Sequence, residues 1–368
     1  MIDFKKQDIE ASYYAKKYCI IIIVLLVISL VFIYSASSVF ALENKGVAEF
    51  FVKKQFVAIL LGFFAALLML ILPAKTVYKL IPVFFWLTFF LTVLTLVPGL
   101  GVKTFGSRRW LKLLITFQPS EFLKCAFVGY VAAILAERSN KSVPLKYLYL
   151  KLIFLIGLVS FILLLQPDFG MTITILITAL SLLLLIPGAS RYVIFTTLAC
   201  APAVILLVIT KSYRLKRILT FLDPWKDPEG AGFQIIQSLI AIGSGGIFGH
   251  GIGYSKQKFF YLPMQHTDFI MAIITEETGF LGAFILIFIY LNLLWTGIKW
   301  SSKVNNSISY YLIIGYTWLI LFQVMMNMAV VSGLFPTKGL GLPFISYGST
   351  AIVALLWYLG VILKVAKI

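Results

Sequence analysis

Charged and metal-binding side chains are scarce in this chain, and their scarcity argues against several classes of protein and site. Only 12% of its 368 residues are charged, whereas 61% are hydrophobic. There are two histidines, His250 and His266, which disfavours a histidine-based metal centre. The three cysteines stand singly within or beside apolar runs, without the spacing of a metal site or a disulfide framework. We interpret them as small apolar residues.

Long apolar runs are what the chain has instead. A soluble protein of this length could not bury so much apolar surface, and each run is long enough to cross roughly 30 Å of hydrocarbon. Because the runs are unbroken rather than alternating, they predict helices. The predicted fold class is an all-α polytopic membrane protein with ten transmembrane helices, at about 18–41, 54–72, 77–97, 119–136, 147–165, 169–187, 190–209, 268–298, 308–333 and 343–364.

The ten runs are predicted to form a single integral-membrane domain over residues 1–368, because no repeat of fixed period interrupts them. The first run is long and lacks an obvious small-residue cleavage site, so no cleavable signal is expected. Lysine and arginine in the short loops place both termini in the cytoplasm. A large loop, at about 210–267, then lies on the outer side between the seventh and eighth helices.

Cations also gather on the outer side, in segments 99–118 and 210–267. Long loops translocate largely regardless of charge, so these cations do not contradict the topology. Attraction to lipid headgroups and an anionic ligand bound at the outer face both explain them.

The long outer loop is rich in aromatic and apolar residues, which argues against disorder. Segment 233–242 is predicted to form a short amphipathic helix at the membrane interface. The glycine run 243–253 lacks the preceding strand and following helix of a nucleotide-binding loop. Its glycines are therefore expected to permit tight turns and the close approach of a ligand or a helix.

Three acids open the eighth run, in the stretch YLPMQHTDFIMAIITEE. Asp268 could serve only to stabilise a helix N-terminus, but ionisable residues at membrane depth are costly and suggest function. In a regular helix Glu276 would lie roughly 12 Å further down, which exceeds the carboxylate separations of glycosidases. We expect one acid near the surface, Asp268, with Glu276 and Glu277 as buried supports.

A second candidate is GSRRWLKLLITFQPSEFLK, at 106–124. Arg109 and Trp110 form an interfacial pair. Glu121 and Lys124 are three residues apart on one helix face and able to pair. A structural ion pair and a ligand contact both fit this spacing.

A third candidate is GLFPTKGLGLPFISYGST, at 333–350. Its prolines and glycines break the helix at membrane depth, where irregular backbone is tolerated only inside protein or around a watery cavity. Lys338 adds a cation. The segment resembles the interrupted helices that form transport or binding sites.

Together these signatures resemble one family. GSRRW with QPSEFLK, PDFG at 167–170, RILTFLDPWKDP, GFQIIQSLIAIGSGG, YLPMQHTDFI with its downstream EE, and PTKGLGLPFISYGS occur in order across nearly the whole chain. They resemble the SEDS (shape, elongation, division and sporulation) family, FtsW/RodA/SpoVE. The segment PTKGL is more like the division members than the elongation members.

The resemblance implies a peptidoglycan glycosyltransferase of the bacterial inner membrane, expected at the division septum, that polymerises lipid II. It implies as partners a class B penicillin-binding protein and other divisome proteins, with no nucleic acid. A divalent cation, Mg²⁺ or Mn²⁺, is an open cofactor prediction. The family's essential loop aspartate falls on Asp268. The residues expected to bind substrate are Arg109, Glu121, Lys124, Lys338 and Ser346, and those expected to support the site are His266, Glu276 and Glu277.

The chain departs from the family pattern in two places. Family members commonly carry Glu where this chain has Met264, and glycine where it has Ser349. Both changes affect local loop and turn geometry while leaving Asp268 in place.

The mechanistic hypothesis is that Asp268 acts as a general base on a sugar hydroxyl. The competing hypothesis is a flippase for the lipid-linked precursor, and a third is a scaffold that recruits a partner's helix. A polymerase keeps its chemical groups at the outer face, whereas a transporter places them near mid-membrane. The stem peptide and an elongation or sporulation role stay open.

Overall fold

The structure is a computed structural model that describes residues 2–104, 107–112, 116–141, 143–209, 212–259, 262–263 and 265–367. A helix lies in each of the ten predicted segments. Seven of the described helices are long and apolar enough to cross a membrane, and α6, α7 and α12 are not among them, so the count of ten spans stays a prediction. The ten helices are α1 (Ile2–Lys45), α2 (Phe50–Ile71), α3 (Ala74–Leu94), α4 (Pro119–Lys141), α5 (Leu145–Leu165), α6 (Phe169–Leu184), α7 (Ser190–Ile209), α10 (Ile270–Ser301), α11 (Ser307–Val331) and α12 (Ser349–Val365).

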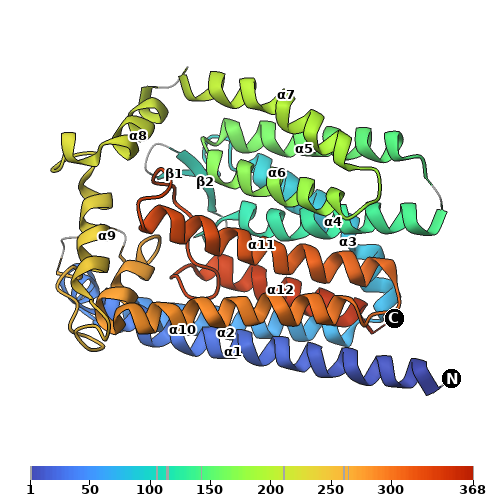
Figure 1. Ribbon diagram of the computed structural model, residues 1–368, viewed down its shortest axis with the longest axis horizontal. Coiled ribbons are helices and arrows are strands. Elements are labelled where there is room, and N and C mark those ends of the chain that lie inside the picture. The colour runs from blue at the N-terminus through green and yellow to red at the C-terminus, as the bar shows by residue number, and fades with distance from the viewer. Residues whose placement is uncertain are drawn as a thin grey trace.

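These helices run side by side along the long axis of the molecule (Figure 1). Helix α12 packs on α2, α1 packs on α10, and α4 lies against both α3 and α11. The two termini lie at the same end, and α8 and α9 lie at the opposite end. Termini at one end agree with an even number of crossings.

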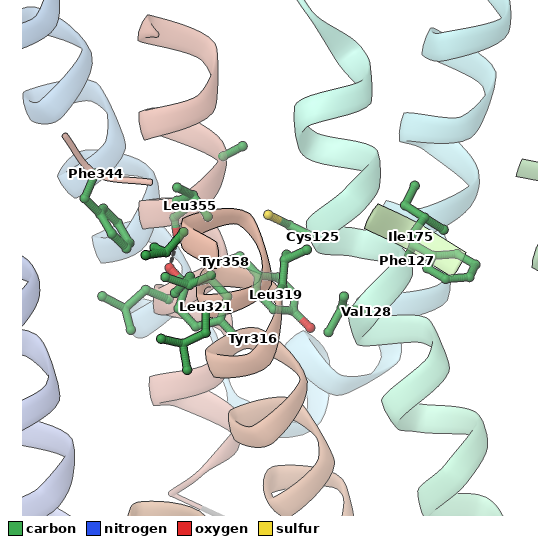
Figure 2. Close-up of a cluster of buried hydrophobic side chains, with 14 of the residues drawn as sticks. Cys125, Phe127, Val128, Ile175, Tyr316, Leu319, Leu321, Phe344, Leu355 and Tyr358 are labelled. Atoms are coloured by element: carbon green, nitrogen blue, oxygen red, sulfur yellow. Dashed lines mark hydrogen bonds between the residues drawn. The ribbon is translucent and has the colours of Figure 1, made fainter. Parts of the chain in front are cut away.

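Buried side chains of α4, α6, α11 and α12 form one cluster of the hydrophobic core, to which Phe344 also belongs (Figure 2). Tyr316 and Tyr358 are fully buried, with ring centroids 5.4 Å apart. The hydroxyl of Tyr316 donates to the carbonyl of Leu355 at 2.8 Å, as a polar group excluded from water must. Cys125 packs in this cluster, and all three cysteines are free, which agrees with their interpretation as small apolar residues.

A small antiparallel sheet, absent from the sequence prediction, connects α3 to α4. It consists of β1 (Gly101–Thr104), β2 (Ser107–Lys112) and β3 (Thr116–Phe117), in the order β1-β2-β3. The strands are too short to give a clear alternating pattern, and Leu111 is the only fully buried position on β2. The sheet carries Arg109 toward the start of α6.

The long loop contains two helices and a 3₁₀ turn, α8 (Ser212–Leu222), η1 (Pro224–Lys226) and α9 (Phe233–Ser244). The predicted helix at 233–242 is confirmed and extends two residues further as α9. Helix α9 packs against α10 and α11, where Ser238 donates to the carbonyl of Val331 at 2.7 Å. Its inner face is therefore covered by protein. Helix α8 was not predicted.

The glycine run docks against a kink in α10. At Gly279 the helix adopts φ 67° and ψ −169°, which opens its hydrogen-bond ladder. The amide of Gly251 donates to the carbonyl of Glu277 at 2.9 Å, and the amide of Phe280 donates to Gly246 at 2.8 Å. A Cβ on Gly249 would lie 2.2 Å from the Glu277 carbonyl oxygen. The predicted close approach is thus confirmed, and the approaching element is a helix.

Candidate active site

The loop that carries Asp268 is held through its backbone. Three successive carbonyls, those of residues 266–268, each accept a hydrogen bond from the C-terminal part of the chain. The donors are, in that order, the amide of Tyr347 at 2.9 Å, the hydroxyl of Ser346 at 2.6 Å and the side-chain amide of Asn327 at 2.7 Å. The backbone at Asp268 therefore has one well-defined position just before α10 begins.

The carboxylate of Asp268, in contrast, is not held by hydrogen bonds from the described residues. Among the described residues it receives no hydrogen bond, and a Cβ on Gly339 would lie 3.3 Å from its Oδ2. Burial raises the pKa of Asp268 from 3.8 to about 6, and Arg109 and Arg217 act in the opposite direction. A carboxyl with this pKa is largely ionised at neutral pH and can still accept a proton.

Segment 332–348, which borders Asp268, crosses the protein as irregular backbone. Leu340, Leu342, Phe344 and Ile345 are buried there. Four of its carbonyls accept hydrogen bonds from side chains of four helices: Leu340 from Asn327 at 2.7 Å, Pro343 from Tyr290 at 2.5 Å, Ile345 from Ser29 at 2.9 Å and Ser346 from Gln55 at 3.2 Å. The irregular backbone is thus packed inside protein at 340–346, whereas Leu334, Phe335 and Gly339 are exposed.

Arg109 and Lys338 meet at Asp168, beside the start of α6. The guanidinium Nε of Arg109 lies 3.5 Å from Oδ2 of Asp168, and its Nη2 donates to the carbonyl of Pro167 at 2.5 Å. A Cβ on Gly170 would lie 2.6 Å from Cε of Lys338, so that side chain lies directly over Gly170. Burial lowers the pKa of Lys338 to about 8, against the opposing effect of Asp168.

Two cationic donors in this cluster make no hydrogen bond to a described residue. Arg109 Nε is buried and its ion pair with Asp168 at 3.5 Å lacks hydrogen-bond geometry, and Lys338 Nζ is buried as well. A buried donor without a hydrogen bond is costly, and an anion in contact with both nitrogens would satisfy them. The prediction that these two residues bind substrate is untested, but the structure brings both to one place.

Glu121 and Lys124 form the predicted pair. Their charged atoms lie 2.5 Å apart on α4, and Lys124 also donates to Gln323 on α11 at 3.4 Å. Both side chains are mostly buried. The pairing is confirmed, and a contact of either residue with substrate stays a prediction.

Glu276 and Glu277 bind the long loop to the helix core. Glu276 accepts hydrogen bonds from the Ser255 hydroxyl at 2.5 Å and from the Lys256 amide at 2.8 Å. Glu277 accepts one from Ser35 at 2.5 Å. It also lies 3.9 Å from the ammonium of Lys258. These contacts agree with a supporting role.

His266 and Ser346 also face inward. The ring of His266 lies 4.5 Å, centroid to centroid, from Phe51, and burial lowers its pKa to about 4, so it is neutral at neutral pH. The Ser346 hydroxyl accepts from the amide of Leu342 at 2.6 Å and donates to Thr267. That hydroxyl is occupied within the fold, and its predicted contact with substrate stays a prediction.

Comparison with known proteins places this arrangement in a family. The family model for FtsW, RodA and SpoVE, described as cell cycle protein, matches residues 16–368. The chain belongs to the FtsW/RodA/SpoVE family. It is 39% identical over 345 residues to the probable peptidoglycan glycosyltransferase FtsW of Geobacter sp. strain M18, covering 94% of each chain. It is 37% identical over 353 residues to stage V sporulation protein E of Bacillus subtilis strain 168, covering 95% of each.

Solved structures agree with this assignment to the FtsW/RodA/SpoVE family. A chain of a peptidoglycan synthase complex, 28% identical, superimposes with a TM-score of 0.76 and covers 95% of this chain and 97% of that one. The rod shape determining protein RodA of Thermus thermophilus, 25% identical, gives a TM-score of 0.70 with coverage of 95% and 96%. The protein is therefore a multi-pass membrane protein.

A metal site built by this family member alone does not fit the described residues. No group of three or more His, Cys, Asp or Glu side chains among them could hold a metal ion. Asp168 faces a guanidinium and an ammonium group, and Asp268 faces two guanidinium groups. Each site therefore offers a single carboxylate beside cations of the protein, which is not a donor set for a metal ion, so we derive no step through a metal.

Sequence reasoning about this family member missed two residues that hold the candidate site in place. Asp168 was noted only within the motif PDFG, although an aspartate directly before an apolar run is a common helix N-cap signal. Its Oδ1 does cap α6, accepting from the Met171 amide at 3.1 Å. Asn327 gave no signal, because a single amide inside an apolar run does not reveal its partners. Met264, one of the two departures from the family pattern, lies outside the described residues.

Proposed function

We propose that this protein is a peptidoglycan glycosyltransferase that polymerises lipid II into glycan strands during cell division. The relatives named probable peptidoglycan glycosyltransferase FtsW support the reaction class. The observation that carries the proposal is Asp268, whose backbone is fixed by Asn327 while its carboxylate is unbonded among the described residues. Arg109 and Arg217 face it.

The chemistry follows from these groups. Asp268 takes the proton of the 4-hydroxyl of one lipid-linked disaccharide as that oxygen attacks the anomeric carbon of the other chain. The new glycosidic C–O bond forms as the bond from the anomeric carbon to the diphosphate oxygen breaks, and the lipid diphosphate leaves with the bonding electron pair. General-base catalysis of this kind contributes typically about 10²–10⁴-fold in rate.

The leaving diphosphate needs positive charge, because negative charge develops on it as the bond breaks. Arg109 Nε and Lys338 Nζ are buried donors that make no hydrogen bond to a described residue. Arg217 on α8 adds a third cation, and it donates to the carbonyl of Thr337 at 3.3 Å, next to Lys338. In this proposal the three cations bind the phosphate oxygens while Asp168 holds Arg109 in place.

The setting of the reaction belongs to the same proposal. The protein resides in the bacterial inner membrane with both termini in the cytoplasm, and it works at the division septum beside a class B penicillin-binding protein and other divisome proteins. The similarity to a chain of a peptidoglycan synthase complex supports such a partner. Asp268 lies two residues before α10, which begins at the end of the molecule where α9 lies, away from the termini, and this supports an outer site (Figure 1).

The flippase alternative draws on the interrupted segment 332–348. Four of its carbonyls are bonded to helix side chains, and Glu276 and Glu277 accept hydrogen bonds from the long loop. Transport would require polar groups free to bind substrate near mid-membrane, and these carbonyls and carboxylates are already occupied. Lys338 Nζ of the same segment, which makes no hydrogen bond to a described residue, is the cation assigned above to the leaving diphosphate. The structure therefore favours the polymerase.

The deciding experiment is polymerisation of lipid II by the purified protein, with and without a candidate class B penicillin-binding protein. Glycan strands resolved by gel electrophoresis are expected. A second arm adds EDTA and then restores Mg²⁺ or Mn²⁺, which tests the open prediction of a divalent cation. A third arm measures translocation of labelled lipid II in liposomes. Translocation without polymer in the first arm would replace this proposal with the flippase.

A further inference from the structure

Asn327 on α11 joins the two segments that carry the acid and a cation of the site. Its side-chain Nδ2 lies 2.7 Å from the carbonyl oxygen of Asp268 and 2.7 Å from that of Leu340. An amide nitrogen has two hydrogens, so both are used. Leu340 is two residues from Lys338, so one side chain fixes the backbone beside both.

The orientation of this amide is determined by its surroundings. Turning it over would place Oδ1 against two carbonyl oxygens, which repel it. In the observed orientation Oδ1 has no hydrogen-bond partner among the described residues. It is also shielded from water, because Asn327 is only 1% exposed. An unsatisfied buried acceptor is costly, and here it accompanies two short hydrogen bonds to the loops of the site.

We propose that Asn327 is a positioning residue, which fixes Asp268 relative to Lys338 so that proton abstraction and departure of the diphosphate are aligned. This rests on the proposed function. Asn327 does not touch substrate in this scheme. Its loss changes the relative placement of the base and the leaving-group cation, and a shift of about 1 Å can cost on the order of 10²-fold in rate.

The test compares Asn327→Leu, which has a similar size and no donors, with Asn327→Asp, which keeps the size and replaces the donor nitrogen. The matched control is Ser309→Ala on the same helix. Ser309 is fully buried and donates to the carbonyl of Val365 at 3.1 Å, at the other end of α11. Control and variants each lose buried hydrogen bonds to backbone carbonyls, and only the variants lose those of the site.

Two readouts are measured on the full-length protein in nanodiscs. The first is the kinetics of lipid II polymerisation, where kcat is expected to fall about 10- to 100-fold with KM within about 2-fold. The second is amide hydrogen exchange, where peptides covering 265–269 and 338–342 are expected to exchange faster while the rest of α11 is unchanged. Ser309→Ala is expected to retain kcat and the exchange of both segments.

Several results would overturn the positioning role. One is an unchanged kcat in folded variants, and another is faster exchange along all of α11. A third is failure of both Asn327 variants to fold when Ser309→Ala folds, because Asn327 would then act in folding. If the wild-type protein makes no polymer, the proposed function fails separately, and local exchange still decides whether Asn327 holds the two segments.

Discussion

Asp268 and the Glu276–Glu277 pair lie close together in sequence, yet the protein holds their carboxylates in opposite ways. The two glutamates are 1% exposed and accept hydrogen bonds from Ser35, Ser255 and Lys256. The carboxylate of Asp268 accepts none from the described residues, and its backbone carbonyl is bonded instead. A carboxylate whose oxygens are already bonded serves structure, whereas one that is fixed only through its main chain is available for chemistry.

The largest expected effect is the loss of activity in Asp268→Asn, which tests whether Asp268 is the acid available for chemistry. We expect lipid II polymerisation to fall by about 10²–10⁴-fold, because the amide cannot accept the proton. Folding should be retained, since the backbone bond from Asn327 does not involve the substituted atoms. Glycan products and thermal unfolding are measured on the same preparation. Polymer formation near the wild-type rate would remove Asp268 as the base.

The pH dependence sharpens the same contrast. Because the pKa of Asp268 is about 6 in the folded protein without substrate, kcat/KM is expected to fall about tenfold per pH unit below pH 6 and to level off above it. The raised pKa also means that the folded state binds this proton more tightly than the unfolded state. The carboxyl therefore contributes stability below about pH 3.8, and that contribution is lost as pH rises through 6.

Asp268→Asn is accordingly expected to be more stable than the wild type at pH 7.5, with the difference disappearing near pH 4. Unfolding temperatures at the two pH values check the sign. A variant less stable than the wild type at pH 7.5 would contradict it.

Substitution of the glutamates should reduce stability rather than activity, the reverse of what is expected at Asp268. Glu276→Gln is expected to lower the free energy of unfolding by about 1.5–3 kcal/mol, because hydrogen bonds to a charged acceptor are weakened. Activity per folded molecule should stay within a few-fold of the wild type. The measurements are unfolding in denaturant and polymerisation per folded protein, and the control is Glu43→Gln, an exposed acid on α1. A large fall in kcat with unchanged stability would give Glu276 a chemical role.

A substitution at the α10 kink, where the glycine run docks, is expected to lower the free energy of unfolding. Gly279→Ala places a Cβ 2.4 Å from the amide nitrogen of Gly249, at a φ of 67°. With ψ at −169°, this backbone conformation is essentially restricted to glycine, and it alone costs roughly 1–3 kcal/mol in a residue with a Cβ. Gly157→Ala in α5 is the control, since no atom lies within 4 Å of the added Cβ. The control substitution Gly157→Ala should instead raise the free energy of unfolding by about 0.5–1 kcal/mol.

The smallest effect is expected at Arg217, an exposed cation near the site. Arg217→Gln should raise KM about 2- to 5-fold and reduce its dependence on ionic strength, as for other exposed charges. Lys226→Gln is the control, because Lys226 pairs with Asp223 at 3.5 Å. An equal change in KM in both variants would indicate general attraction of the anionic lipid rather than a local contact.

The sequence predicted the helices well, because an apolar run of this length has few alternatives in a membrane. It also predicted α9, the irregular backbone of segment 332–348 and the pairing of Glu121 with Lys124. It missed the sheet at 101–117 and the kink at Gly279. Short strands leave little periodic signal, and a helix break at a glycine depends on a distant loop that docks there.

The members of the candidate site were predicted, but their arrangement was not. Asp268 stood out because ionisable residues at membrane depth are costly, and the roles of Arg109 and Lys338 were implied by the family resemblance. The residues that arrange them did not stand out, since Asn327, Gln55 and Ser29 are neutral polar side chains within apolar runs. Their roles follow from which carbonyl each one reaches, and that is determined by packing between helices distant in sequence.

The three hydrogen bonds on the carbonyls of residues 266–268 determine when, during synthesis, the site around Asp268 can form. All three donors lie between Asn327 and Tyr347, and a chain emerges from the ribosome N-terminal part first. Asp268 therefore leaves the ribosome long before the groups that fix it. A nascent chain that has not yet been translated through Tyr347 carries the aspartate without the groups that fix it, so enzymatic competence requires synthesis beyond that residue.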